Sequence, residues 1–371
     1  MKYDKAKSIG IIIGIIISIF LIGQQLGILG FLTGLMGGLV ENSRYEMAQI
    51  WVVDVTTENA NSLPQINESL VREIKSINGV AETYPMVIAS ASIKFKDGNT
   101  ASLLLVGSEA PHFVAGPRSE KIAEGDINAL LNPGAISADI FDENTLGNNL
   151  DIGTRLEING KEAFIRMKTN NARGFSGSFG YTTLTQARYY ANLPNNKVNA
   201  IAVKVKPGYA MNNVIKAINN SIYGVRAWDV MNLKNTTVKR ITVSSNIGTS
   251  VGSLVIFAII SGFFIIGLTL YSSVLDRLKD YGTLKAIGAT NGYVRKLILV
   301  QAFLFAVIGF SLAYFLLQGF KNAVANVGLV FEYSTGQLVS LFVITLFISI
   351  GGSLFAIKRV NAVDPAFVFK G

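Results

Sequence analysis

Cysteine is absent from this sequence, and His112 is its one histidine. Disulfide frameworks, Cys/His metal sites and cysteine nucleophiles therefore cannot be built from this chain. Charged residues are also scarce, at 15% of the 371 residues, whereas 50% of the residues are hydrophobic. This balance is unusual for a soluble protein and indicates a membrane protein.

Four long stretches contain no charged residue: 8–40, 241–275, 297–320 and 333–357. Each exceeds the roughly 20 residues that a transmembrane helix needs, so we predict four membrane spans. Lysines precede the first stretch, as in a signal peptide, but its apolar run is too long for one and we expect it to be retained. As helices, the first two stretches would be on the order of 50 Å long. We therefore expect these two to leave the bilayer as a stalk, and the other two to be ordinary spans.

The distribution of charge predicts the orientation. Basic residues outnumber acidic ones in 1–7, 276–296 and 358–371, whereas 41–240 holds 21 basic and 19 acidic residues. By the positive-inside rule, the N-terminus, the segment 276–296 and the tail are cytoplasmic, and 41–240 and the short loop 321–332 lie outside. The net charge of +9 then reflects topology and lipid contact. A nucleic-acid surface would need a basic groove with interleaved aromatics, which the sequence lacks.

The insert 41–240 is long enough to form its own α+β domain. Strand–helix–strand patterns occur at both of its ends, which predicts one split α/β lobe from 41–109 and 191–240. Residues 110–190 are predicted to form a second, mostly β lobe, and a hairpin is expected to turn at Asp97 and Gly98. The expected fold is thus four transmembrane helices with a large two-lobed domain between helices 1 and 2.

Motifs for catalysis are lacking. No G-x-x-x-x-G-K-[ST] occurs, so we expect no ATP hydrolysis by this chain and no catalytic or metal site. The stretch "RGFSGSFG" (173–180) departs from the G-x-S-x-G of serine hydrolases and has only His112 as a possible base, which favours a flexible loop. Asp142 and Glu143 lie in a polar turn, where we expect solvated carboxylates with ordinary pKa values.

Small residues recur along the first span. Gly23, Gly27, Gly30 and Gly34 follow each other at spacings of three and four, and Gly38 comes a turn later. Such a face allows close approach of another helix, so we predict a packing face that serves either a dimer or contacts within the chain.

A charged segment, "DRLKDYGTLKAIGAT" (276–290), separates the second and third spans. Its leucines and Ile287 recur at near-helical spacing, with charged residues in other directions, which predicts an amphipathic helix that Gly288 ends. Three interpretations of such a helix are open: a plain connector, a helix that lies on lipid headgroups, or a helix that docks on a soluble partner. The spacing of its residues does not decide between them.

The stretch "YSSVLDRLKDYGTLKAIGATNGYVRKLILVQAFLFAVIGF" (271–310) resembles the signature of MacB/FtsX-type ABC transporter permeases. The end of the chain, "AIKRVNAVDPAFVFKG", is similar to the tail of the same family. The four-span layout with one large insert also matches, so the resemblance covers essentially the whole chain. Within this family, the sequence most resembles the DevC-like exporter permeases.

This resemblance implies a permease that works in pairs, as a homodimer or related heterodimer, in the bacterial inner membrane. A separate ATPase subunit would bind ATP and Mg, and this chain would hold no cofactor. The first two helices would transmit the closure of the ATPase to the periplasmic domain. Export or extraction of a periplasmic or lipidic substrate follows, with a periplasmic adaptor (membrane fusion protein) and an outer-membrane duct as further partners. Carried over by position, the residues that contact the ATPase are Tyr281, Gly282, Leu284, Lys285, Ala286, Ile287 and Gly288, and those that fix the tail are Asp364 and Pro365.

Two alternatives stay open. FtsX-like members of the family relay ATP hydrolysis to a periplasmic cell-wall hydrolase and transport nothing. A membrane-anchored sensor or binding module without an ATPase is the other, although a sensor would not need the docking signature.

Overall fold

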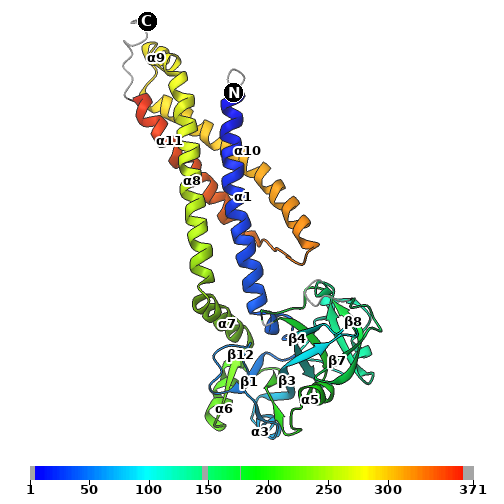
Figure 1. Ribbon diagram of the computed structural model, residues 1–371. Helices are drawn as coiled ribbons and strands as arrows, with labels where there is room; N and C mark the ends of the chain where they lie inside the picture. The colour runs from blue at the N-terminus through cyan, green and yellow to red at the C-terminus, as the bar shows by residue number, and fades with distance from the viewer. Residues whose placement is uncertain (1–4, 144–148, 176, 362–371) are drawn as a thin grey trace. The chain divides into compact units, whose positions relative to one another are not determined.

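The computed structural model describes residues 5–143, 149–175 and 177–361. The chain divides into two compact units: a helical unit, made by residues up to Phe31 and from Asn246 onward, and an α+β unit from Leu32 to Ser245. Helix α1 (Lys5–Met36) contributes residues to both units (Figure 1). The α+β unit thus follows the first long helix and precedes the second, as the sequence predicts.

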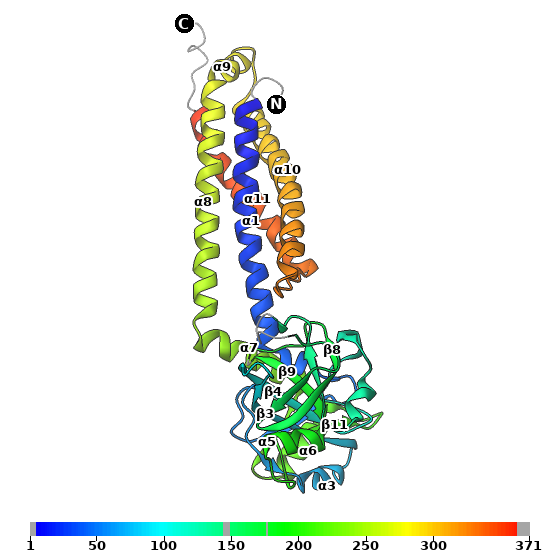
Figure 2. The same cartoon turned by 45° about the vertical axis from the view of Figure 1, so that its right-hand side comes forward.

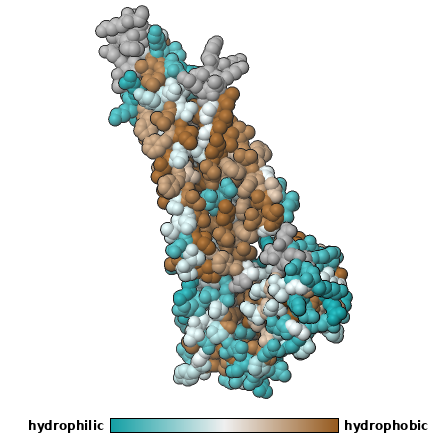
Figure 3. All heavy atoms as spheres, viewed as in Figure 1, coloured by the Kyte–Doolittle hydropathy of each residue, from teal (hydrophilic) through white to brown (hydrophobic). Residues whose placement is uncertain are grey.

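The helical unit contains, besides α1, the helices α8 (Ile247–Asp276), α9 (Leu278–Ala286), α10 (Asn291–Ala325) and α11 (Thr335–Asn361). Within the described residues, α1, α8, α10 and α11 are long and apolar enough to cross a membrane. Their inner sides share one core, which includes Ile266 and Phe305. On their outer sides, large apolar side chains such as Phe315 (70%) and Phe347 (68%) stay exposed, and Figure 3 shows brown surface over these helices. Such a surface suits hydrocarbon, and the prediction of four membrane spans is confirmed.

The third membrane helix is longer than the uncharged run 297–320 that predicted it. Helix α10 has 35 residues and includes Arg295, Lys296 and Lys321, which flank the uncharged run. It begins after Thr290, whose Oγ1 accepts a hydrogen bond from the backbone N of Tyr293 (3.2 Å). Lysine and arginine are good helix formers, so the end of an uncharged run does not end a helix.

The second uncharged run, 241–275, is divided between two helices. Asn246 adopts a left-handed conformation (φ 57°) and separates α7 (Val230–Ser244) from α8. Asparagine tolerates this conformation better than most residues. The first residues of the run, 241–244, therefore end a helix of the α+β unit, and α8 begins at Ile247.

The α+β unit is built around a sheet of ten strands in its described part. The main path is β12-β1-β11-β3-β7-β8-β5, with β4 beside β3 and β9, and β6 beside β8; β2 and β10 form a separate pair. The strands are β1 (Ile50–Asp54), β2 (Ile66–Asn67), β3 (Val80–Lys94), β4 (Thr100–Ser108), β5 (Ile122–Glu124), β6 (Ala135–Asp139), β7 (Arg155–Ile158), β8 (Lys161–Thr169), β9 (Ser178–Thr183), β10 (Lys197–Val198), β11 (Ala200–Val205) and β12 (Val225–Asp229). The helices are α2 (Gly38–Glu41), α3 (Leu70–Lys75), α5 (Leu184–Ala191), α6 (Met211–Ser221) and α7, with 3-10 turns at Ser119–Lys121 and Ile127–Leu131.

The two ends of the insert meet in one lobe. The units β1-α3-β3 and β11-α6-β12 interleave as an antiparallel sheet in the order β12-β1-β11-β3. This is the split βαβ arrangement of ferredoxin-like domains. Along β1, Ile50 and Val52 share a core with α3 and α6, whereas Trp51 and Val53 belong to a second core with α2 and α7.

Strand β3 links this lobe to the rest of the sheet. It has 15 residues, and its outer half, with Ala91 and Ile93, packs in a third core with residues of β4, β6, β7 and β8. The β3–β4 hairpin turns at Asp97 and Gly98, where Gly98 has a φ of 88°. The outer core therefore uses residues 91–105 as well as the predicted 110–190, so the two lobes share one sheet.

Candidate functional site

The segment between the second and third membrane helices folds as α9. Gly288 (φ 104°) ends it: its N donates to the carbonyl O of Lys285 (3.0 Å), and the N of Ala289 donates to that of Leu284 (2.9 Å). This pair of bonds is a Schellman motif, in which glycine takes the left-handed position at no steric cost. The predicted helix and its predicted stop are both present.

One side of α9 faces the core of the helical unit. Tyr281 is 5% exposed and belongs to that core, Gly282 is buried, and Leu284 packs against the core. The Nζ of Lys285 donates to the carbonyl O of Val360, near the end of α11, over 2.6 Å. Partial burial lowers the pKa of Lys285. These contacts fasten α9 to the end of α11.

The other side of α9 is open. Ile287 is 77% exposed, and its neighbours Ala286 and Gly288 are exposed as well. We call these three residues the α9 tip. Of the seven residues predicted to contact an ATPase, Tyr281 and Gly282 are turned into the chain's own core, so the exposed surface of the motif is the α9 tip. The apolar spacing that predicted an amphipathic helix could not tell an inner face from a docking face.

Three chain segments meet at one end of the helical unit. Figures 1 and 2 show the start of α1, the helix α9 and the end of α11 at the same end, away from the α10–α11 connection. The described parts of the predicted cytoplasmic segments thus lie at one end of this unit. Asp364 and Pro365, predicted to fix the tail, lie outside the described residues.

The glycine face of α1 packs within the chain. A Cβ added to Gly23 would lie 2.5 Å from a side-chain carbon of Leu317 on α10, and one added to Gly27 would lie 2.7 Å from the hydroxyl of Tyr333. Gly30 approaches the connection to α11 less closely, and a Cβ at Gly34 would meet nothing within 4 Å. Of the two predicted uses of this face, the structure therefore supports contacts within the chain for Gly23 and Gly27.

The segment that resembled a hydrolase motif serves the fold of the α+β unit. The carbonyl O of Arg173 accepts a hydrogen bond from Nδ2 of Asn42 (3.0 Å), and the N of Phe175 donates to the carbonyl O of Leu35 (2.8 Å). His112 is exposed, and its ring packs edge-on against the ring of Tyr84, with 5.2 Å between the ring centroids.

Sequence reasoning missed a buried pair of carboxylates. Asp139 is fully buried and accepts hydrogen bonds from Oγ1 of Thr169 (2.9 Å) and the N of Ala172 (2.8 Å). Asp142, expected to be solvated, is 2% exposed, and among the described residues its Oδ2 has no hydrogen-bond partner. Burial, and next the charge of Asp139, raise the pKa of Asp142 to about 7. The sequence signal for this pair was weak: one aspartate ends strand β6 and the other follows three residues later.

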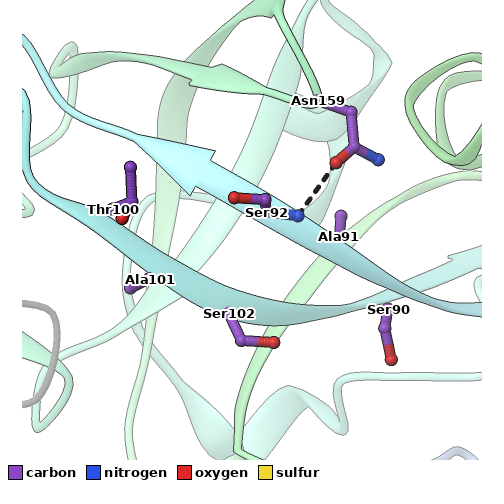
Figure 4. Close-up of a pocket in the computed structure, with 7 residues that line it drawn as sticks. All are labelled: Ser90, Ala91, Ser92, Thr100, Ala101, Ser102 and Asn159. Carbon is purple, nitrogen blue, oxygen red and sulfur yellow. Dashed lines mark hydrogen bonds between the residues drawn. The ribbon is translucent and has the colours of Figure 1, made fainter.

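A shallow hollow on the outer face of the β3–β4 hairpin offers polar but uncharged groups. It is lined by Ser90, Ala91, Ser92, Thr100, Ala101, Ser102 and Asn159 (Figure 4). Oδ1 of Asn159 accepts a hydrogen bond from the N of Ser92 (2.9 Å), so this amide ties the β7–β8 turn to β3. The serine and threonine hydroxyls lie at separate positions along the two strands and do not point toward a common centre (Figure 4).

The part of the chain from α8 to α11 is similar to a known family. Residues 252–365 match the family model described as FtsX-like permease C-terminal. Uncharacterized ABC transporter permeases from two strains of Mycobacterium tuberculosis are 24% identical over 96% of this chain and 95% of theirs. Residues 252–365 thus match the FtsX-like permease type, and nearly the whole chain is similar to ABC transporter permeases. The resemblance stated from the sequence is confirmed.

Two solved structures are similar to part of the chain. One is the extracellular domain of the noncanonic ABC-type transporter YknZ from Gram-positive bacteria, with a TM-score of 0.36 and 11% identity over 48% of this chain and 98% of that one. Another is the periplasmic region of MacB from Actinobacillus actinomycetemcomitans, with a TM-score of 0.39 and 8% identity over 52% of this chain and 94% of that one.

Proposed function

We propose that this chain is the membrane-spanning subunit of an ABC transporter and that a separate ATPase subunit docks on the α9 tip. One observation carries the proposal: Ile287, a large apolar residue, is 77% exposed at the end of a helix whose other side is anchored in the core. An exposed apolar group on a rigid, charged helix is suited to fill a groove on a soluble partner. The ATPase would supply ATP and Mg, since the sequence contains no P-loop.

The contacts around α9 suggest how force would pass into the membrane. A push on the α9 tip acts on Tyr281 in the core and, through Lys285, on the end of α11. Helix α1 packs in the same core and continues as one helix to Met36, inside the residues of the α+β unit. We propose that closure of the ATPase is transmitted along this path to the α+β domain, which acts outside the cell membrane on a periplasmic or lipidic substrate.

The test of docking is the variant Ile287→Asp, with co-purification of the ATPase from native membranes as the measurement. A charge at a surface position should leave the fold intact and lower recovery of the ATPase at least tenfold, because a buried unpaired charge is costly at an interface. Val327→Asp is the matched control, since Val327 is also apolar and 64% exposed but lies in the α10–α11 connection. Leu284→Asp is unsuitable, because Leu284 packs against the core.

The same purification separates the possible outcomes. Undiminished ATPase binding by Ile287→Asp would disprove the α9 tip as the docking surface, and an unaltered chain that recovers no ATPase would disprove the coupling itself. A co-purifying membrane fusion protein, with an outer-membrane duct, supports export, whereas a cell-wall hydrolase supports a signal relay of the FtsX kind. A second copy of the permease, identical or related, is expected in either complex.

A further inference from the structure

A groove between α8 and α11 joins apolar walls to two cations. Its lining residues are Phe264, Leu268, Tyr271, Phe355, Lys358 and Arg359, and its volume is about 430 Å³. On α8, the three lining residues follow each other at spacings of four and three residues, which places them on one face of the helix. On α11, Lys358 lies three residues after Phe355, and Arg359 is its neighbour. Volumes of this order are typical of small-molecule sites, which range over roughly 300–1,000 Å³.

Close helix packing next to the groove gives it a rigid edge. At the α8–α11 crossing, a Cβ on Gly352 would lie 3.0 Å from the backbone N of Gly267. Beside the crossing, the rings of Phe263 and Phe355 pack edge to face, with 5.6 Å between their centroids. The walls at Phe264 (52%), Leu268 (65%) and Phe355 (46%) nevertheless remain open, so something apolar must cover them in the membrane.

The cations at the mouth of the groove are not neutralised by the described chain. Lys358 and Arg359 are exposed in the last turn of α11, and neither makes a salt bridge to a described residue. They follow the apolar part of α11 at the end of the helical unit that carries α9 (Figure 2). Tyr271 adds a hydroxyl at the same level, as is common where a span reaches the headgroups.

We propose that this groove binds one anionic phospholipid. The acyl chain lies against Phe264, Leu268 and Phe355, and the phosphate lies between Lys358 and Arg359. Basic pockets between membrane helices at the headgroup level are suited to anionic lipids, because charge and hydrophobic surface are satisfied by one molecule. The proposal requires only that these helices span a membrane, so it stands or falls separately from docking of an ATPase.

The experiment is native mass spectrometry of the purified full chain in detergent with added dioleoyl phosphatidylglycerol or dioleoyl phosphatidylcholine. Phosphatidylglycerol should occupy one site in preference to phosphatidylcholine. The double variant Lys358→Gln/Arg359→Gln should lower the affinity for phosphatidylglycerol about twenty-fivefold, because each cation near the headgroup contributes about fivefold. Arg295→Gln/Lys296→Gln is the matched control, because it removes the same charge from exposed positions at the start of α10, outside the groove, and should change affinity less than twofold.

A variant of the apolar wall tests the other half of the site. Leu268→Trp fills the groove without a change of charge and should also displace the lipid. Equal binding of the two lipids, an equal loss in the Arg295/Lys296 control, or full competition by inorganic phosphate would each disprove a lipid site. Leu268→Cys provides a further check: efficient disulfide-linked dimers in native membranes would show that a second copy covers the groove instead, which overturns the proposal.

Discussion

Burial of Asp142 makes the α+β unit sensitive to pH at the scale of one residue. Its pKa of about 7 in the folded chain compares with 3.8 for an unperturbed aspartate. Between these values the folded state binds more protons than the unfolded state does, so the free energy of unfolding falls as pH rises and levels off above about pH 7. A shift of this size corresponds to about 4 kcal/mol at most.

We therefore predict that the unaltered chain is less stable at pH 8 than at pH 5, and that Asp142→Asn removes most of the difference by keeping the side chain neutral. The measurement is denaturant unfolding followed by tryptophan fluorescence. Both tryptophans of the chain, Trp51 and Trp228, lie in the α+β unit, so the signal reports this unit alone.

Asp151→Asn is the control for this prediction. Asp151 is exposed, and a hydrogen bond from Lys168 lowers its pKa, so it stays ionised in both states from pH 5 to pH 8. The variant should keep the pH dependence of the unaltered chain. A pH dependence that survives in Asp142→Asn would show that another group causes it.

At the scale of elements, glycine at a helix crossing decides how closely two spans approach. Gly352→Ala places a methyl group 3.0 Å from the backbone N of Gly267, so α8 and α11 must separate. We predict a destabilisation of about 1–3 kcal/mol, the usual cost of overpacking. The measurement is thermal unfolding in detergent, followed by helical circular dichroism.

Gly319→Ala on α10 provides the comparison. A Cβ at Gly319 would meet nothing within 4 Å, so this variant gains the helix propensity of alanine without a clash and should be stabilised by up to about 1 kcal/mol. Equal effects of the two substitutions would mean that the crossing is not tightly packed.

The elements were predictable where local chemistry decides them. Uncharged runs indicated the four spans, and Asp97 and Gly98 indicated the β3–β4 turn. Prediction failed where tertiary contacts decide. The left-handed Asn246, the extension of α10 through Lys321 and the inward side of Tyr281 depend on caps and neighbours that a sequence pattern does not contain.

The candidate site was predictable only in part, for the same reason. Motif resemblance singled out residues 281–288, but it could not separate Tyr281, which is buried, from Ile287, which is exposed. The environment of Asp142 was missed because it includes residues distant in sequence: the charge of Arg173 acts on its carboxylate, and Ser178 forms a hydrogen bond with it.

At the scale of the whole molecule, the distribution of charge predicts that the α9 side faces the cytoplasm and the α+β unit lies outside. The absence of cysteine makes this directly testable, because each introduced cysteine is unique. Asn196 is exposed in the α+β unit and Lys279 is exposed on α9. Asn196→Cys in intact spheroplasts should react with a membrane-impermeant maleimide, and Lys279→Cys should react only after the membrane is opened.

The reverse pattern would invert the topology and remove the α9 tip as a site for a cytoplasmic ATPase, whereas reaction of both before opening would show that Lys279 is not enclosed by the membrane.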